Sequence, residues 1–362
     1  TVTPEAKGRS PVVPRTDIPD LFLRAVEVFP DATAFKVLGG KEWTYREYKT
    51  EVQSFARRLG SMGMSKNATV HINGANSPYW VIAYLGTVLA GFVPIGIDVS
   101  SGRNRCSRLV TESRAELVIC DNAVKAEFYL GKAISAGVKN VVIWGEVKYP
   151  EPPQQDIPIC SWGDFVQEFE PVGPVSDSIG PAAKWSAPSS TDCCSMIDAD
   201  DLLPNSRGSD QQLVMLSHDN IAWTTASLAH ALGISPKEKL VSHLPLSQIT
   251  TQITDIFLPL YAAAERQSHM EVTFTPQGTP LLATVLGVRP TVFVGAPEVW
   301  ETIRVAVDAK TPSGGMMGGV VASTKKSALG HYMSHQFPAP PVDPNGGGVP
   351  RNLLSGLVQS AI

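Results

Sequence analysis

The sequence lacks the short motifs that by themselves identify a chemistry. Its 362 residues contain no GxxxxGK[ST] phosphate loop, no GxGxxG after an apolar strand, no HExxH and no GxSxG. Charge is also scarce: 18% of the residues are charged, the net charge is −4, and no basic stripe or acidic run occurs. The sequence therefore gives no reason to expect a nucleic-acid partner or a solvated charged tail.

Cysteine is rare as well. The five cysteines are irregularly spaced and none forms a CxxC pair: Cys106, Cys120, Cys160, Cys193 and Cys194. We expect free thiols in a reducing compartment, with neither a disulfide framework nor a metal site. Residues 1–14 lack the apolar core of a signal peptide, so a cytoplasmic location is expected. Hydrophobic residues make up 43% of the chain, which is enough for a large buried core.

One uncharged stretch, residues 79–97, approaches the length of a membrane span. Its local signals favour a different interpretation. Ser77 followed by Pro78 is a typical helix start, and Gly91 is a typical helix end. Residues 92–97 then read as a short apolar strand. The stretch is therefore predicted to be a buried helix followed by a buried strand.

Helical and strand patterns alternate along most of the chain. Apolar residues recur at helical spacing from Ile18 to Phe29, and Thr44 with Glu47 has the spacing of a capping box. Short apolar strands separated by helices predict an α/β fold with mostly parallel sheets. Further helices are expected from residue 77, at 103–113, 123–136, near 165, at 219–232, 247–264, near 281 and through 300–303. Strands are expected at 68–72, 92–97, 116–120, 141–144, 240–244, 272–275 and 291–294.

Several phrases, taken in order over some 290 residues, resemble one family. They are WTYREY (43–48), NSPYW (76–80), LAGFVPIG (89–96), CCSMI (193–197), VMLSHDNI (214–221), LPLS (244–247) and VRPTVFVGAPEVW (288–300). Together they resemble the N-terminal part of long-chain fatty acid–CoA ligases of the adenylate-forming, or AMP-binding, superfamily. The bubblegum-type branch is the most similar.

The resemblance implies a fold and an organisation. The expected fold is the truncated N-terminal core of the adenylate-forming fold, with two mostly parallel sheets, flanking helices and no C-terminal lid. Residues 306–362 have no periodicity and many glycines and prolines, so they are expected to be a disordered tail. The remaining expected parts are a flexible segment (1–16) and an AMP-binding domain (17–305), in which 66–232 form the first sheet and 17–65 with 236–305 contribute to the second.

The resemblance also implies a reaction. Members of the family join a fatty acid to ATP and then transfer the acyl group to coenzyme A, with Mg²⁺. The phosphates are held by a Gly/Ser/Thr-rich loop followed by a lysine, because glycine lets backbone N–H groups close on phosphate. The family's adenine- and ribose-binding phrases, hinge and catalytic lid have no counterpart in this sequence.

The phosphate loop should lie between Ile197 and Val214, and it departs from the family pattern. The loop retains Ser206, Gly208 and Ser209, while Gln212 stands at the lysine position. Arg207 is the one cation that could substitute for that lysine. Aspartates at 198, 200, 201 and 210 add negative charge where a triphosphate should sit. We therefore expect a surface loop that binds no nucleotide, and no catalytic residue is assigned.

Other positions match the family only in part. Ser217 and His218 belong to the phrase near the nucleotide, although His218 is expected to cap the helix that follows. Gln248 replaces a usual histidine beside the acyl pocket, and Glu298 replaces a usual arginine. The other acyl-pocket candidates are Gly295, Ala296 and Pro297. His243 is interpreted as a strand residue, and Phe257, Tyr261 and Trp300 are interpreted as core.

Two interpretations of function follow. The first is a fatty acid–CoA ligase that uses ATP, Mg²⁺ and coenzyme A. The second is a non-catalytic chain, either a truncated or misassembled product or a partner-binding pseudoenzyme. If the chain binds a ligand, a long-chain fatty acid is expected ahead of ATP, and membrane association, if any, is peripheral on the endoplasmic reticulum.

Overall fold

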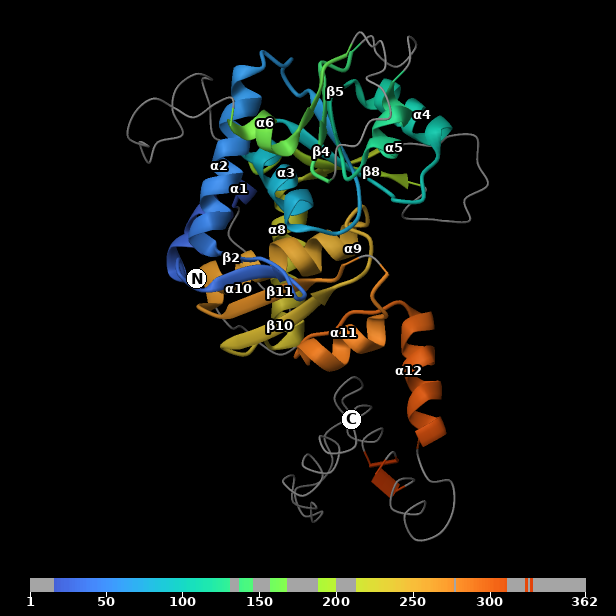
Figure 1. The fold of residues 1–362 in the computed structure, drawn as a ribbon. Coiled ribbons are helices and arrows are strands. Elements are labelled where there is room, and N and C mark those ends of the chain that lie inside the picture. Colours follow the sequence, from blue (N-terminus) through green and yellow to red (C-terminus); the bar gives the residue numbers. More distant parts are fainter. Residues whose placement is uncertain are drawn as a thin grey trace. The chain divides into compact units, whose positions relative to one another are not determined.

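A computed structural model describes residues 16–130, 137–145, 157–167, 188–199, 213–276, 278–310, 323–324 and 326–327. The chain divides into two compact units, Thr1–Val294 and Gly295–Ile362. Within the first unit, described strands form two sheets with helices layered between them (Figure 1). The predicted α/β fold with two mostly parallel sheets is confirmed.

The first sheet has the strand order β7-β6-β5-β3-β4-β8-β9. Its strands are parallel except for β9, which pairs antiparallel with β8. The strands are β3 (Thr69–Asn73), β4 (Val93–Ile97), β5 (Ala115–Cys120), β6 (Asn140–Ile143), β7 (Ile159–Ser161), β8 (Cys193–Asp198) and β9 (Leu213–Ser217).

The second sheet has the order β10-β11-β1-β2. It joins an N-terminal hairpin, β1 (Thr33–Val37) and β2 (Glu42–Thr44), to β10 (Lys237–Ser242) and β11 (His269–Phe274). Strands β10, β11 and β1 run parallel, whereas β2 is antiparallel to β1. The sequence patterns did not predict this hairpin, although β1 is as long as the predicted strands β3 and β4.

Local capping signals fix the first three helices. In α1 (Ile18–Val28) the Asp17 side chain accepts a hydrogen bond from the Asp20 N–H. The predicted capping box is present at α2 (Tyr45–Ser61), where Thr44 and Glu47 bond each other's backbone N–H. Ser77 caps α3 (Pro78–Leu89) through the Trp80 N–H. Helix α3 and β4 are buried as predicted, and no described helix is long and apolar enough to cross a membrane.

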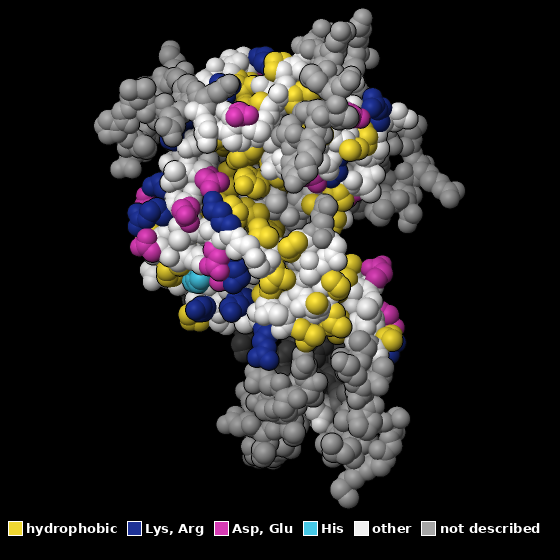
Figure 2. All heavy atoms as spheres, viewed as in Figure 1, with side chains coloured by type: hydrophobic (Ala, Val, Ile, Leu, Met, Phe, Trp, Pro, Cys, Tyr) yellow, Lys and Arg dark blue, Asp and Glu magenta, His cyan; other side chains and the backbone are white. Residues whose placement is uncertain are grey.

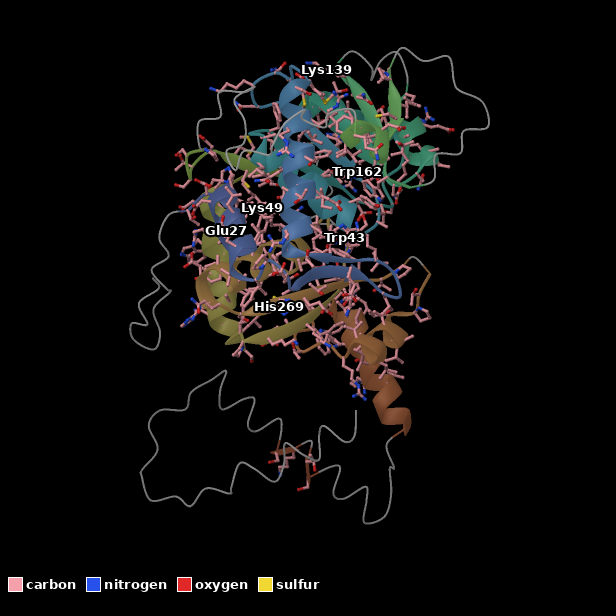
Figure 3. All side chains as sticks on the ribbon, turned by 60° about the vertical axis from the view of Figure 1, so that its left-hand side comes forward. Glu27, Trp43, Lys49, Lys139, Trp162 and His269 are labelled. Carbon is pink, nitrogen blue, oxygen red and sulfur yellow. The ribbon has the colours of Figure 1, made fainter. Side chains whose placement is uncertain are left out.

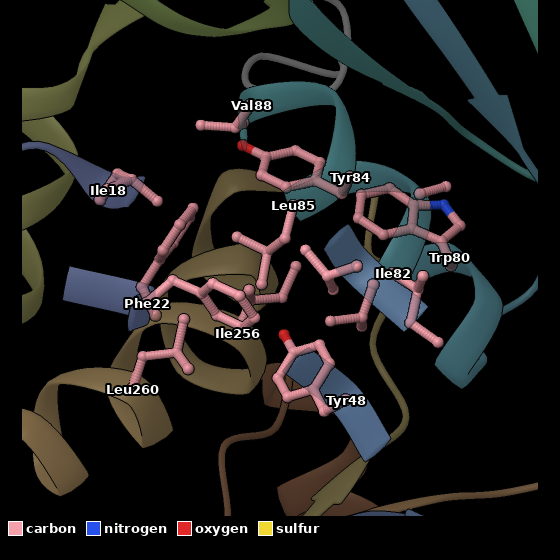
Figure 4. Close-up of a cluster of buried hydrophobic side chains, with 14 of the residues drawn as sticks. Ile18, Phe22, Tyr48, Trp80, Ile82, Tyr84, Leu85, Val88, Ile256 and Leu260 are labelled. Atoms are coloured by element: carbon pink, nitrogen blue, oxygen red, sulfur yellow. The ribbon is translucent and has the colours of Figure 1, made fainter. Parts of the chain in front are cut away.

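The main core lies between the two sheets. Side chains from α1, α2 and α3 meet those of the later helices and of both sheets in one apolar cluster. Figure 4 shows Phe22, Tyr48, Leu85, Ile256 and Leu260 converging at its centre. Phe22 and Tyr48 pack edge to face with their ring centroids 5.2 Å apart. Burial of such aromatic and aliphatic side chains supplies most of the stability of a domain of this kind.

The outer face of the first sheet carries a second cluster under α4 (Arg103–Ser113), α5 (Ala123–Ala126) and the 3₁₀ turn Glu127–Tyr129. Side chains alternate along β5, so that Leu117 and Ile119 face the main core while Val118 and Cys120 face this second cluster. All five cysteines are free thiols.

Polar contacts at the surface link neighbouring elements. Glu27 of α1 and Lys49 of α2 form an ion pair at 3.7 Å, and both are visible in Figure 3. His269, labelled in the same view, lies 2.7 Å from the Thr33 carbonyl and so ties β11 to the chain entering β1. Exposed pairs of this kind contribute little stability, so these contacts set geometry more than energy.

The structure corrects several expected elements. Of the helix expected at 123–136, only α5 and its 3₁₀ turn lie among the described residues before 131. The helix expected at 247–264 is interrupted: α9 (Ile249–Gln252) passes through a π-helical turn (Ile253–Phe257) into α10 (Leu258–Arg266). The strand expected at 291–294 is absent, and only an isolated bridge joins Val292 to Leu240.

The remaining helices follow the pattern more closely. They are α6 (Trp162–Gln167), α8 (His218–Leu232), α11 (Leu281–Val288) and α12 (Pro297–Lys310), of which α12 belongs to the second unit. The flexible segment expected at 1–16 and the tail expected at 306–362 fall largely outside the described residues. The expected domain limits stay predictions.

Candidate functional site

A cavity of about 340 Å³ lies where the parallel strands of both sheets end. Loops that follow β3, β4, β10 and β11 form its wall together with the first residue of α11. Crevices outside the carboxyl ends of parallel strands are where open α/β sheets bind ligands. The lining residues are Ala75, Asn76, Val99, Ser242, His243, Pro245, Thr275, Pro276, Thr279 and Leu281.

Asn76 holds the two sheets together at this cavity. Its side-chain nitrogen donates to the Ser242 hydroxyl at 2.9 Å and to the Leu244 carbonyl at 2.6 Å. Its side-chain oxygen accepts from the Leu246 N–H at 3.0 Å. Asn76 follows β3 of the first sheet, whereas the partners follow or end β10 of the second. One amide therefore fixes the shape of the loop that borders the cavity.

A buried carboxyl group lies behind that loop. Asp255 sits in the π-helical turn, and its carboxyl accepts from the Thr254 hydroxyl at 2.6 Å. Burial raises the pKa of Asp255 to about 7, against the opposing effect of the Ser242 and Thr254 hydroxyls. The second carboxyl oxygen has no hydrogen-bond partner within the described part of the chain. π-Helical turns often mark functional positions, which makes Asp255 part of the candidate site.

His243 lines the cavity and also borders a small internal gap that Asp255 lines. Its Nε2 is 2.7 Å from the Val294 carbonyl and its ring stacks on Phe293 with centroids 5.0 Å apart. Burial lowers the pKa of His243, although the hydrogen bond to Val294 opposes this effect. The interpretation of His243 as a strand residue is wrong, because β10 ends at Ser242 and His243 faces the cleft.

Comparison with known proteins identifies the family to which the chain belongs. The sequence profile described as AMP-binding enzyme matches residues 22–173 and 211–341. The chain belongs to the AMP-binding enzyme family. Similar curated proteins are the long-chain-fatty-acid–CoA ligases ACSBG2 of Mus musculus, 27% identical over 300 residues, and of Rattus norvegicus, 29% identical over 300 residues. Each match covers 79% of this chain and 42% of the relative, so the chain spans less than half the length of these relatives.

Solved structures of adenylate-forming enzymes share the fold. A putative long-chain-fatty-acid CoA ligase from Rhodopseudomonas palustris superposes with a TM-score of 0.61 at 17% identity, covering 80% of this chain and 66% of that one. Apo MatB from the same organism gives 0.60 at 20% identity, covering 79% and 50%. The predicted resemblance to bubblegum-type ligases and to the adenylate-forming fold is thus confirmed.

The segment predicted to be an altered phosphate loop overlaps a break in the family match, which skips residues 174–210 but resumes before Gln212. Ser206, Arg207, Gly208, Ser209 and Gln212 lie outside the described residues. Their assignment to a degenerate ATP loop stays a prediction.

Asp198, which ends β8 and begins the predicted loop, corrects one expectation. Asp198 is buried, and its carboxylate pairs with Arg105 at 2.8 Å and with Arg108 at 3.2 Å. Two guanidinium groups therefore neutralise it. The expectation that Asp198 repels a triphosphate is wrong, since its charge is already compensated inside the family's first sheet.

The structure changes the role predicted for His218. Ser217, not His218, caps α8 by accepting from the Asn220 N–H at 3.1 Å. His218 is buried and its Nδ1 accepts from the Ile18 N–H, the first N–H of α1, at 3.1 Å. The prediction that His218 caps the following helix is wrong, because it caps a helix 200 residues away. Burial lowers the pKa of His218, while the carboxylates of Asp17 and Asp192 oppose this effect.

The acyl-pocket candidates separate in the structure. Gln248 occupies the N-cap position of α9 without a side-chain cap bond and does not line the cavity. Gly295, Ala296 and Pro297 begin the second unit, so their role in an acyl pocket stays a prediction. Phe257 and Tyr261 are core residues as predicted. Trp300 is not, since it is 49% exposed and bonds the Gly295 carbonyl.

Sequence reasoning missed Asn76, Ser242 and Asp255 as members of the site. One signal was available, because Asp255 is the only Asp, Glu, Lys or Arg between Leu240 and Ala264. Burying a lone carboxylate in an apolar segment costs free energy, so such a residue is a candidate for a functional role. No group of metal-ligating side chains occurs among the residues for which positions are given.

Proposed function

We propose that this family member binds a long-chain fatty acid in the cleft at the strand ends and does not form an acyl-adenylate. The observation that carries the proposal is the altered loop between β8 and β9, where the family's phosphate-binding residues are replaced. Two of the phrases that resemble the family contribute to the cleft, since Pro245 of LPLS (244–247) and Asn76 of NSPYW (76–80) line it.

Binding of a fatty acid requires few exactly positioned polar groups. Each buried methylene contributes roughly 0.8 kcal/mol, so a long acyl chain can bind without exact polar contacts. Val99, Pro245 and Leu281 supply apolar wall, while Ser242 and Thr275 supply hydroxyls at the same cavity. This mixture suits a ligand with an apolar body and one polar end.

Formation of an acyl-adenylate requires more exactly positioned polar groups than fatty-acid binding does. Stabilising a transferring phosphoryl group requires several positioned donors, and loss of one such donor costs roughly 10²- to 10³-fold in rate. In this sequence the glycine run and the lysine are both replaced, and Gln212 cannot supply the positive charge. The residues present in this part of the sequence therefore do not fit ATP with Mg²⁺.

The test measures binding and catalysis on the same preparation. Isothermal titration should detect palmitate binding, whereas palmitate-dependent pyrophosphate exchange should stay at background. Gln212→Lys alone should leave exchange at background, because the glycine run is still altered. Exchange above background from the unmodified chain would contradict the proposal and favour the alternative, an active ligase; Arg207→Ala would then be the first variant to assay.

A matched pair of variants locates the ligand. Val99→Asp places a charge on the cavity wall and should weaken palmitate binding at least about tenfold, since one desolvated charge costs more than one factor of ten. Val124→Asp changes an exposed valine on α5, outside the cavity lining, and should leave the affinity unchanged. Equal affinities of the two variants would place the ligand elsewhere.

A further inference from the structure

The described lining of the cavity contains no Asp, Glu, Lys or Arg side chain. A fatty acid is a carboxylate at neutral pH, and burying that charge without a compensating partner costs free energy. His243 is the one ionisable residue of this lining, and its Nε2 already donates to the Val294 carbonyl. The Asn76 amide donates to Ser242 and Leu244. The head group of the ligand therefore depends on hydroxyl donors.

Two hydroxyls meet at neighbouring strand ends. Ser242 ends β10 and is in register with Phe274, the last residue of β11, so Thr275 lies at the adjacent strand end. Ser242 and Thr275 both line the cavity. The Thr275 hydroxyl is buried and has no hydrogen-bond partner within the described part of the chain. A pair of hydroxyls suits the two oxygens of a carboxylate, because each supplies one O–H donor.

The buried carboxyl group of Asp255 acts on one of these hydroxyls. Burial raises the pKa of Asp255 to about 7, although hydrogen bonding by Ser242 opposes this effect. One oxygen of the carboxyl group is without a partner among the described residues. His243 lines the cavity and also borders the gap that Asp255 lines. An ionised Asp255 would therefore repel a ligand carboxylate in a cavity whose described lining offers no cation.

The Ser242 hydroxyl has one proton and two lone pairs. One lone pair accepts from the Asn76 amide at 2.9 Å. When Asp255 is ionised, its carboxylate attracts the Ser242 proton away from the cavity. When Asp255 is protonated, its own O–H can donate to the second lone pair, and the Ser242 proton is then free to point at a ligand. The protonation state of Asp255 thus decides whether Ser242 is a donor in the cavity.

We propose that the cleft holds a fatty-acid carboxylate on the hydroxyls of Ser242 and Thr275, and that one proton from solvent enters with it and is carried by the positioning residue Asp255. Only O–H bonds change, since a buffer acid loses the proton that Asp255 gains. The acyl chain would run towards Leu281, the first residue of α11, over which hydrophobic side chains gather in Figure 2. This inference rests on the proposed function, because it concerns the head group of the same ligand.

Other ionisable groups around Asp255 do not supply this proton. Helices α8, α9 and α10 pack against the π-helical turn, and α3 meets it through the ring of Tyr84. Helix α9 carries no ionisable side chain, and the buried sides of α8 and α10 carry His218 and Tyr261. Burial lowers the pKa of His218 and of His243, and it raises the pKa of both tyrosines. None of the four therefore changes charge between about pH 7 and pH 9.

Calorimetric titration of palmitate between pH 6 and pH 9 tests the proton uptake. The dissociation constant of the unmodified chain should rise roughly tenfold for each pH unit above about 7, because Asp255 must first regain its proton. Asp255→Asn keeps an uncharged donor, so its affinity should not show this rise. Both proteins meet the same palmitate solution, so the ratio of their dissociation constants cancels the ionisation of the ligand. In buffers of different ionisation enthalpy, the unmodified chain should take up about one proton more than the variant at pH 9.

A second pair of variants tests the head-group site. Thr275→Val removes the hydroxyl and keeps the shape of the side chain, so palmitate binding should weaken roughly tenfold at every pH, the usual effect of losing a hydrogen bond to a charged group. Thr273→Val is the matched control. Thr273 lies two residues earlier on β11, its hydroxyl also lacks a partner among the described residues, and it does not line the cavity. Its affinity should stay unchanged.

The outcomes separate this inference from the proposed function. Parallel pH curves for the unmodified chain and Asp255→Asn would overturn the proton uptake and leave the fatty-acid cleft standing. So would the absence of proton uptake by the unmodified chain at pH 9, which needs no variant. Equal affinities of Thr275→Val and Thr273→Val would overturn the head-group site. Absence of palmitate binding at every pH would overturn the proposed function and this inference together. Urea unfolding at each pH shows whether the variants are folded.

Discussion

Asp255 is a buried ionisable residue of the candidate site, and burial changes its pKa. Its carboxyl group is buried in the π-helical turn behind the loop that Asn76 holds, and its pKa is raised to about 7. An unfolded aspartate ionises near pH 3.8. Between about pH 4 and pH 7, the folded state therefore keeps a proton on Asp255 that the unfolded state has already released.

This difference predicts a pH-dependent effect of Asp255→Asn. As pH rises from about 4 to about 7 the unmodified chain loses stability, because only its unfolded state ionises readily, and above about pH 7 the loss is constant. The loss is at most a few kcal/mol, since one pKa unit corresponds to about 1.4 kcal/mol. Asparagine cannot ionise, so the variant should be the more stable protein near pH 8, with the gap shrinking towards pH 5. Urea unfolding at both pH values measures it.

Glu238→Gln is the matched contrast. The pKa of Glu238 is lowered: burial acts to raise it, but hydrogen bonds from Thr291 and Ser235 outweigh burial. Its carboxylate stabilises the fold above the unfolded pKa and this contribution is lost as pH falls. The Gln variant should therefore be less stable than the unmodified chain near neutral pH, with a gap that narrows in acid. The same sign of pH dependence for both variants would contradict this account.

At the level of single residues, those of the site were harder to predict from the sequence than those that cap the helices. Capping pairs such as Thr44 with Glu47 are local, and the structure bears them out. His218 had a local interpretation too, yet its partner is the Ile18 N–H, 200 residues away. His71 gave no signal at all, although it is buried beside the Ser113 hydroxyl at 2.8 Å and burial lowers its pKa to about 3. Contacts that depend on packing between distant segments have no sequence period.

At the scale of helices and strands, buried strands and capped helices were predictable because hydrophobic period and end signals agree. The uncharged stretch at 79–97 illustrates this, since Ser77 and Gly91 marked α3 correctly. Two of the misses have separate causes: β2 has only three residues, too few for a period, and the π-helical turn continues a helical pattern. The strand expected at 291–294 has apolar residues but forms only a bridge, because it meets β10 at one position.

Gly96 at the end of β4 tests how closely the elements of the cleft approach. A Cβ atom at this position would lie 2.8 Å from Ser247 Cα, a backbone atom that cannot turn away. Gly96→Ala should therefore destabilise the chain by roughly 1–3 kcal/mol, the usual cost of overpacking. It should also weaken palmitate binding, since Ser247 belongs to the loop bordering the cavity. Urea unfolding and palmitate titration measure the two effects.

The control for this substitution is Gly60→Ala in α2. A Cβ there meets nothing within 4 Å, and alanine favours the helix over glycine. That variant should be as stable as the unmodified chain or more stable by up to about 1 kcal/mol, with unchanged affinity. If Gly96→Ala behaved like Gly60→Ala, the close approach of β4 to the loop would carry no consequence for the cleft.

At the scale of the whole described chain, the main core spans both sheets. The cleft, in contrast, depends on a few polar links across the sheet ends. The family match breaks at residues 174–210, and this range includes most of the segment between β8 and β9 that is predicted to be an altered phosphate loop. A family member can keep its core while losing a loop, because the core is fixed by many interchangeable apolar contacts and the loop by specific donors.

Asn76 is the link between the sheets whose loss should separate stability from binding. Asn76→Ala removes both donors to Ser242 and Leu244 and the acceptor for Leu246. Leaving the buried Leu246 N–H and the Leu244 carbonyl without this partner should cost roughly 1–3 kcal/mol. The loop bordering the cavity would also lose its anchor, so palmitate affinity should fall. Urea unfolding and palmitate titration on the same samples check both effects.

Two variants make the Asn76 result specific. Asn76→Asp keeps the acceptor for Leu246 but removes the donors, so it should lie between the unmodified chain and Asn76→Ala in both measurements. Asn122→Ala removes the cap of α5, where the Asn122 side chain accepts from the Lys125 N–H, and should cost about 1 kcal/mol without changing palmitate affinity. If Asn122→Ala and Asn76→Ala lowered the affinity equally, the loss would reflect general destabilisation. If Asn76→Ala lowered stability alone, the amide would join the two sheets without shaping the cleft between their strand ends.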